Sequence, residues 1–138
     1  MPSDSHTERF AGLPRTDLPD GLTVVEARTR KARRRGLSRL DSLPADHGLL
    51  IKTVSVHTFG MRFALDLIWL NRDGTVVRVD HNVPPGRMRT CLKARSVVET
   101  VAGRADAFLS AGVGTPGGGP SAQASSRRSD ELERDRGA

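Results

Sequence analysis

The sequence predicts a single compact α+β domain built on a mostly antiparallel β-sheet, a roll or partly open barrel, with two short helices. A chain of 138 residues has room for one domain. Short runs rich in β-branched residues alternate with turn residues, as expected for strands that are joined by hairpins. Aromatic residues make up 4% of the chain, so the core is expected to be aliphatic.

The first half of the domain is predicted from its β-branched runs and its turn residues. Thr29 is placed to cap a helix, and Gly36 is placed to end or kink it. In chain order we expect a strand at 22–27, a helix through 31–35, a turn at 44–48 and a strand at 48–52.

The second half centres on a predicted β-hairpin that is entered through a glycine-containing loop. Residues 66–70 are almost all apolar, which indicates a strand covered on both faces. Asn, Arg, Asp and Gly at 71–74 suit a tight turn, after which residues 75–79 are expected to return antiparallel.

The chain after the hairpin is predicted to begin with a loop. Pro84 and Pro85 have no amide hydrogen, so the stretch 82–93 is not expected to join the middle of a sheet. A strand at 94–101 and a short helix at 105–109 complete the predicted domain.

Charge and composition divide the chain into three parts. The formal net charge is +6, and residues 22–113, the expected domain, carry 16 basic and eight acidic side chains. Residues 1–21 are predicted to be a disordered leader, and residues 114–138 a flexible Gly/Pro/Ser-rich and charged tail. No apolar run is long enough for a spanning helix and no signal region is recognisable, so we expect a cytoplasmic protein without a membrane span. Cys91 is the single cysteine and is expected to be an ordinary loop thiol.

Several motifs between residues 25 and 113 follow the order seen in one bacterial and archaeal family. The central one covers residues 56–63 (VHTFGMRF) and is followed by Leu65-Asp66. Over about two-thirds of its length the chain resembles the DUF192 family, also called UPF0127, and this resemblance implies the fold but no reaction. The other matching motifs are Ala27 and Thr29, Arg35-Gly36-Leu37, Leu43, Gly48-Leu49-Leu50, Asp73-Gly74, Val76-Val77, residues 83–87, Ala94-Arg95-Ser96-Val97-Val98-Glu99 and Ala102-Gly103.

The chain departs from the family pattern at three places. Ala64 replaces the usual proline before Leu-Asp, and Gly86 stands where an aromatic residue is usual. The last strand of the family has no counterpart, because residues 112–117 run directly into the Gly-rich tail. We therefore expect a sheet edge to be exposed there.

Polar side chains gather in the central motif beside a hydrophobic strand. Asp66 lies within the apolar strand, where a carboxylate without a partner is costly. Arg62 or the backbone amides of the 57–62 turn are available as partners, so Asp66 is predicted to pin that loop. Glu99 is expected close to this group in space. A ligand-binding or catalytic role for Asp66 is the alternative.

Enzymatic and metal chemistry are weaker interpretations of the same residues. A small hydrolase-like enzyme would use Asp66 and His57, but a triad with Ser96 lacks the strained elbow that presents a serine nucleophile. His47 and His81 add candidate metal ligands without a recognisable spacing, so no metal and no cofactor are predicted.

A basic segment at residues 28–39 offers another alternative, because it holds seven bases and no acid. Such a segment suits nonspecific binding of nucleic acid or another polyanion through phosphates or similar groups. No stacking aromatic residue or nucleic-acid module accompanies it. The side chains that would bind are Arg28, Lys31, Arg34, Arg35 and Arg39.

The favoured interpretation is a non-catalytic binding or accessory domain. It would present the 57–66 and 82–90 loops as one polar surface to a protein or polyanion partner whose identity the sequence leaves open. The residues expected on this surface are His57, Met61, Arg62, Asp66 and Arg87.

Overall fold

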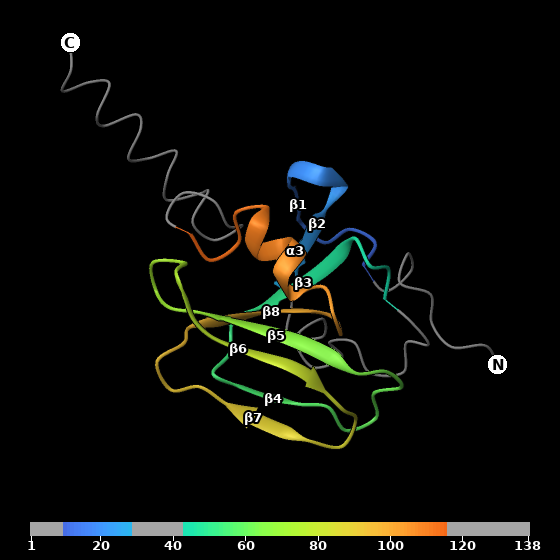
Figure 1. The fold of residues 1–138 in the computed structure, drawn as a ribbon, viewed down its shortest axis with the longest axis vertical. Helices are drawn as coiled ribbons and strands as arrows, with labels where there is room; N and C mark the ends of the chain where they lie inside the picture. The colour runs from blue at the N-terminus through green and yellow to red at the C-terminus, as the bar shows by residue number, and fades with distance from the viewer. Residues whose placement is uncertain (1–9, 29–42, 116–138) are drawn as a thin grey trace, which may run out of the picture.

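The computed structural model describes residues 10–28 and 43–115, and Figure 1 shows the fold. The helix expected after Thr29 lies outside these residues, whereas the helix expected at 105–109 is present. The described elements, in chain order, are β1 (Arg15–Asp17), the 3-10 turn η1 (Pro19–Gly21), β2 (Thr23–Glu26), β3 (His47–Ile51), β4 (Ser55–His57), β5 (Leu65–Leu70), β6 (Val76–Val83), β7 (Met88–Thr90), β8 (Ser96–Val101) and α3 (Ala105–Ser110).

The strands form two sheets. Six of them make one sheet in the order β1-β2-β3-β8-β5-β6, and β4 and β7 pair as a separate two-stranded sheet. All neighbours in the large sheet are antiparallel except β2 and β3, which are parallel. A parallel pair needs a long connection, and residues 27–46 provide it. The sheet is therefore mixed and open, which corrects the expected roll or partly open barrel.

Strand β5 lies at the centre of the core, and all six of its residues are buried. Leu65, Leu67 and Trp69 belong to the apolar cluster on one face of the sheet, and Ile68 and Leu70 to the cluster on the other. This alternation is that of a strand with both faces covered. The prediction for residues 66–70 is confirmed.

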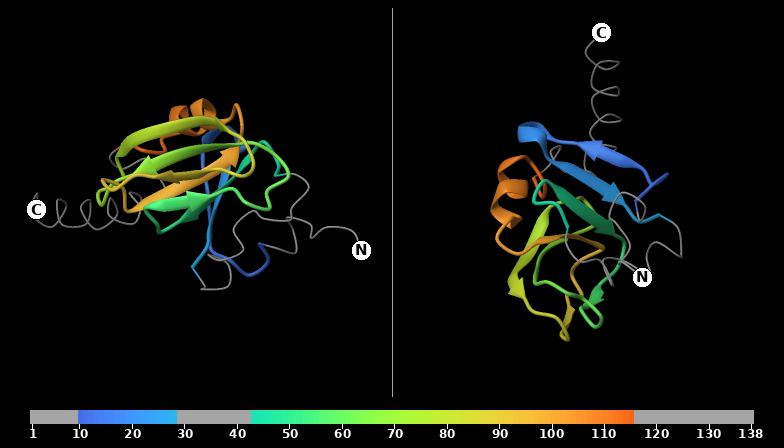
Figure 2. Two further views of the ribbon diagram at one scale, coloured as in Figure 1. Left: turned by 90° about the horizontal axis from the view of Figure 1, so that it is seen from below. Right: turned by 90° about the vertical axis from the view of Figure 1, so that its right-hand side faces the viewer.

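Two different elements cover the two faces of β5. Helix α3 packs through Phe108 on the face of Ile68, and the β4–β7 pair packs through Val56 on the face of Trp69. The views in Figures 1 and 2 agree with this arrangement, with α3 and the β4–β7 pair on opposite sides of β5.

The folded region begins before residue 22, within the stretch 1–21 that was predicted to be a disordered leader. Strand β1 pairs antiparallel with β2, and Leu18 is buried in the core. A strand of three residues, Arg-Thr-Asp, offers no hydrophobic period, so pattern analysis does not detect it.

The C-terminal end of the described chain packs on the sheet without forming a strand. The carbonyl of Gly114 accepts a hydrogen bond of 2.9 Å from the amide of Val76, at the start of β6. Gly114 has a φ of +82°, and a Cβ at this position would lie 2.8 Å from Cβ of Val76. Val113 is buried beside it. A tight turn thus stands where the family pattern has its closing strand.

Candidate functional site

The 57–62 and 82–90 loops meet through one threonine. The amide of Thr58 donates to the carbonyl of Arg87 at 2.7 Å, and the amide of Arg87 donates back to Oγ1 of Thr58 at 2.8 Å. The same hydroxyl donates to the carbonyl of Pro84 at 2.8 Å, and the carbonyl of Thr58 accepts from Gly86 at 3.0 Å. Thr58 is buried, so these hydrogen bonds hold both loops in one fixed arrangement.

We expect the Thr58→Val variant to lose about 2 kcal/mol of unfolding free energy, because it leaves the Arg87 amide and the Pro84 carbonyl without their hydroxyl partner. Urea unfolding followed by tryptophan fluorescence measures this loss. Thr90→Val is the matched control, since its hydroxyl is exposed and contacts only Ser55, at 3.2 Å. Equal stability of the two variants would show that the Thr58 hydroxyl does not help to hold the loops together.

The β4–β7 pair extends this connection into a short two-stranded ribbon. Ser55, Val56 and His57 face Thr90, Arg89 and Met88 in antiparallel register. Val56 and Cys91 turn inward to the core. The alternate residues turn outward and are exposed. We call the exposed outward side chains, with the basic side chains that flank them, the ribbon surface; its members are Ser55, His57, Phe59, Met88, Thr90 and Leu92, flanked by Arg62, Arg87 and Lys93.

The ribbon surface concentrates exposed apolar side chains. Phe59 is 53% exposed, Met88 58% and Leu92 84%. The imidazole of His57 stacks on the ring of Phe59, with 5.4 Å between the ring centroids. Across the described part of the chain, the only other large hydrophobic side chains in this exposed class are Val54, next to the ribbon, and Val77. Apolar exposure of this kind marks interaction surfaces.

The charge around the ribbon has a single sign. Residues 52–62 and 86–95, which contain the two strands and their flanking turns, hold six basic side chains and no acidic one. Arg62, Arg87 and Lys93 are exposed. Together with the apolar side chains, this cationic frame is suited to an anionic partner that also offers apolar contacts.

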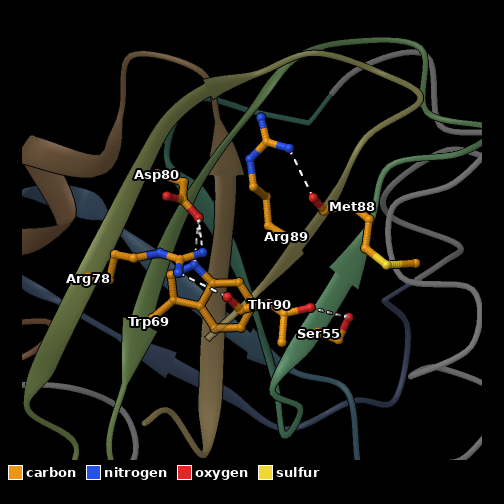
Figure 3. A network of polar contacts seen from close by, with 7 residues as sticks. All are labelled: Ser55, Trp69, Arg78, Asp80, Met88, Arg89 and Thr90. Atoms are coloured by element: carbon orange, nitrogen blue, oxygen red, sulfur yellow. Dashed lines mark hydrogen bonds and ion pairs between the residues drawn. The ribbon is translucent and has the colours of Figure 1, made fainter. Parts of the chain in front are cut away.

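A polar network fastens the ribbon to the large sheet, as Figure 3 shows. Arg78 on β6 donates to the carbonyl of Thr90 on β7 at 2.9 Å and to the carboxylate of Asp80 at 2.8 Å. The same carboxylate oxygen accepts from Nε1 of Trp69 at 2.9 Å, and the Arg78 guanidinium lies 5.4 Å from the centre of the Trp69 ring. Burial alone would raise the pKa of Asp80, but the hydrogen bonds from Arg78 and Trp69 outweigh it and lower this pKa.

Asp66 was predicted to lie on the polar surface of the 57–66 and 82–90 loops, but it is not part of the ribbon surface. Its side chain is 1% exposed. One carboxylate oxygen accepts from the amide of Asn82 at 2.8 Å, and the other from Gly103 at 2.9 Å and Ala105 at 3.0 Å. His81 lies 3.7 Å away. Asp66 therefore pins the end of β6 and the corner before α3.

The prediction that Asp66 pins the preceding 57–62 loop is therefore wrong, because Asp66 pins other segments of the chain. Its carboxylate is saturated by backbone amides that lie far along the chain, rather than by Arg62 or by the 57–62 turn. The 57–62 loop depends on Thr58 instead.

Glu99 is also separated from Asp66. In the β5–β8 register Glu99 faces Leu67 while Asp66 faces Thr100, so the two carboxyl groups leave the sheet on opposite faces. Glu99 is 4% exposed and has no hydrogen-bond or ion-pair partner within the described residues. Desolvation by burial raises the pKa of its carboxyl to about 7.

Other predicted site residues have different surroundings. Met61 is half-buried against the core, and Arg28 pairs with Glu26 at 2.7 Å. Cys91, expected to be an ordinary loop thiol, directly follows β7 and is buried. The remaining predicted polyanion-binding side chains, Lys31, Arg34, Arg35 and Arg39, lie outside the described residues.

Neither a metal cluster nor a membrane-spanning helix is found where the chain is described. The residues at 10–28 and 43–115 contain no group of three or more His, Cys, Asp or Glu side chains that could hold a metal ion. None of the helices in those ranges has the length and apolar character that crossing a bilayer requires.

The Arg78–Asp80–Trp69 network was not predicted from the sequence. Two signals were available: Arg78 and Asp80 alternate with valines along β6, and the single tryptophan needs a partner for its ring N–H once it is buried. The exposed Phe59 and Met88 were also missed as surface residues, because the short strands β4 and β7 were not predicted.

Comparisons with known proteins support the fold. No curated protein matched the chain. A putative transcription regulator from Sinorhizobium meliloti has a similar crystal structure, with 24% identity, a TM-score of 0.58, and coverage of 72% of this chain and 86% of its own. A protein of unknown function from Novosphingobium aromaticivorans is similar at 18% identity and a TM-score of 0.56, covering 75% of this chain and 91% of its own.

The family model for DUF192, described as an uncharacterised ACR, matches residues 8–113. That range contains the large sheet, the ribbon and helix α3. The chain belongs to the DUF192 family.

Proposed function

We propose that this protein is a non-catalytic binding domain that captures an anionic partner on the ribbon surface. The observation that carries the proposal is the coincidence, on one short ribbon, of exposed Phe59, Met88 and Leu92 with a cationic frame that contains no acid. A large exposed apolar side chain has a free-energy cost in water that a partner can relieve.

The rigidity of the ribbon supports the same role. Thr58 joins the two loops, and Arg78 ties β7 to β6. A preorganised surface loses less conformational entropy when it binds than mobile loops do. The loop pair foreseen from the sequence thus keeps His57, Arg62 and Arg87 as proposed binding residues, without Asp66.

A hydrolase that uses Asp66 and His57 has less support. The Asp66 carboxylate is buried and holds three backbone amides, while His57 stacks on Phe59 at the outside of the ribbon. A general base must reach the proton that it abstracts. The Asp66 side chain leaves the large sheet on the face covered by α3, whereas His57 lies on the ribbon that covers the other face. The cytoplasmic location expected from the sequence stays a prediction.

Fluorescence anisotropy with labelled heparin as the polyanion probe tests the proposal. Arg87 is exposed and its side chain makes no hydrogen bond or ion pair within the described residues, so Arg87→Glu changes the surface charge with little effect on the fold. We expect this variant to weaken heparin binding about tenfold at low salt.

Two matched variants make the result specific. Arg15→Glu reverses an exposed charge on β1, at the far edge of the sheet, and is expected to keep the wild-type affinity. Arg34→Glu reverses a charge in the basic segment 28–39. If only Arg34→Glu weakens binding, or if Arg15→Glu weakens it as much as Arg87→Glu, the ribbon surface is not the binding site.

A further inference from the structure

We infer that the anionic partner of the ribbon surface is a membrane surface rich in anionic lipid headgroups, which Leu92, Met88 and Phe59 enter as apolar anchors. This inference rests on the proposed function, since it names the partner of the same surface. Three observations support a membrane as the partner. They are the exposed apolar side chains, the positive sign of the flanking charges and the poor fit of other partners.

The exposed apolar side chains lie on the ribbon and in the turns that follow its two strands. Ser55 and His57 alternate along β4, and Met88 and Thr90 alternate along β7; all four are exposed. Alternate residues of a strand point the same way, so the two strands present these four side chains on one outward face. Phe59 and Leu92 are exposed in the turns that directly follow β4 and β7. Figure 3 shows Met88 leaving its strand in a different direction from Arg89, which lies on the side of Asp80.

The flanking cations suit the headgroup layer of such a membrane. Arg62, Arg87 and Lys93 lie next to the apolar anchors in the sequence, and the flanking turns contain no acid that would be repelled. Basic side chains strengthen membrane binding through electrostatic attraction to an anionic bilayer. Apolar side chains strengthen it by burying apolar area at the boundary of the acyl chains. Exposed aliphatic side chains such as Leu92 gain from an apolar medium and cannot stack on bases.

Other partners fit this surface less well. A peptide that adds a strand to β4 would need the free edge of Ser55, but both its amide and its carbonyl are hydrogen-bonded to the hydroxyl of Thr53. A second copy of the chain would bring cations against cations. Single-stranded nucleic acid is held by successive stacking platforms, and Phe59 is the only Phe, Tyr or Trp among the outward side chains of the ribbon.

The test uses the full chain and vesicles of phosphatidylcholine with an equal amount of phosphatidylglycerol. A tryptophan is placed on the ribbon by Leu92→Trp, or on β6 by Val77→Trp, which is exposed and lies off the ribbon surface. Trp69 is fully buried and supplies the background signal of the wild type. We expect brominated lipids to quench the added fluorescence of Leu92→Trp and to leave that of Val77→Trp unchanged.

Vesicle cosedimentation with Met88→Ser/Leu92→Ser measures the apolar contribution without changing charge. We expect about tenfold weaker partitioning than for the wild type, and no partitioning onto vesicles of phosphatidylcholine alone. Unchanged partitioning of the double variant, or equal quenching at positions 92 and 77, would overturn the inference.

Binding to heparin, vesicles and an oligonucleotide, compared with each other, distinguishes a failure of the membrane inference from a failure of the proposed function. Heparin binding that depends on Arg87 without vesicle binding would end the membrane inference and leave the binding domain in place. Binding of an oligothymidylate that depends on Phe59, without vesicle binding, would replace the membrane with nucleic acid. Failure to bind heparin, vesicles and oligonucleotide would remove both proposals.

Discussion

Replacing Asp66 with asparagine is expected to lower the free energy of unfolding by about 3 kcal/mol, a large part of the stability of a small domain. The Asp66 carboxylate accepts from the amides of Asn82, Gly103 and Ala105. An asparagine keeps the shape but turns an NH₂ group toward at least one of these donors. The loss therefore combines weaker hydrogen bonds with a buried amide that has no acceptor.

Urea unfolding measures this change, with the fluorescence of Trp69 as the probe, since it is the single tryptophan and is fully buried. Asp73→Asn is the matched control, because Asp73 is exposed in the β5–β6 turn and loses the same charge. We expect the control to change stability by less than about 0.5 kcal/mol. If Asp66→Asn unfolds at the same urea concentration as the control, the carboxylate does not hold the corner before α3.

The second large effect is a pH dependence set by Glu99. Burial raises the pKa of this carboxyl from its ordinary value of 4.5 to about 7. Between these values the folded protein holds a proton that the unfolded chain has released. The stabilisation is complete below pH 4.5 and is lost as the pH rises through 7, and it amounts to about 3 kcal/mol.

The Glu99→Gln variant removes this titration and keeps the size of the side chain. We expect the variant to be more stable than the wild type above pH 7 and to show a flatter stability profile between pH 5 and pH 7. The groups whose pKa values are lowered in the folded protein, Asp46 and Asp80, act below pH 4, outside this range.

Urea midpoints measured across this pH range provide the profile. Asp106→Asn removes an exposed carboxylate and is expected to leave the wild-type slope in place. Parallel profiles for the wild type and Glu99→Gln would mean that Glu99 is hydrated in the folded protein, contrary to its burial.

Much of the large sheet could be predicted from sequence because its strands carry strong local signals. The apolar run at 65–70, the turn at 71–74 and the valines of β8 identify the central strands. Strands β1, β4 and β7 have three residues each and gain their order from pairing with distant segments, which local pattern does not record. The parallel pairing of β2 and β3 also joins segments that lie far apart in the sequence, so local pattern does not record it.

The binding site stays a prediction, but the structure changes which residue joins its loops. Juxtaposed loops at 57–62 and 82–90 are what the structure has, but Thr58 joins them and Asp66 does not. A carboxylate in an apolar strand indicates that it has hydrogen-bond donors nearby. The fold decides which backbone amides these donors are, and the local sequence does not. The β5–β8 register determines the face of the sheet on which the Glu99 side chain lies, and the sequence does not reveal this register either.

We propose that this protein binds its partner on the ribbon surface. Amide chemical shifts of the full labelled chain, recorded while a short heparin oligosaccharide is added, test it most directly. We expect the perturbed amides to cluster at residues 54–62 and 86–93. Perturbations confined to residues 28–39, with the ribbon unchanged, would contradict it.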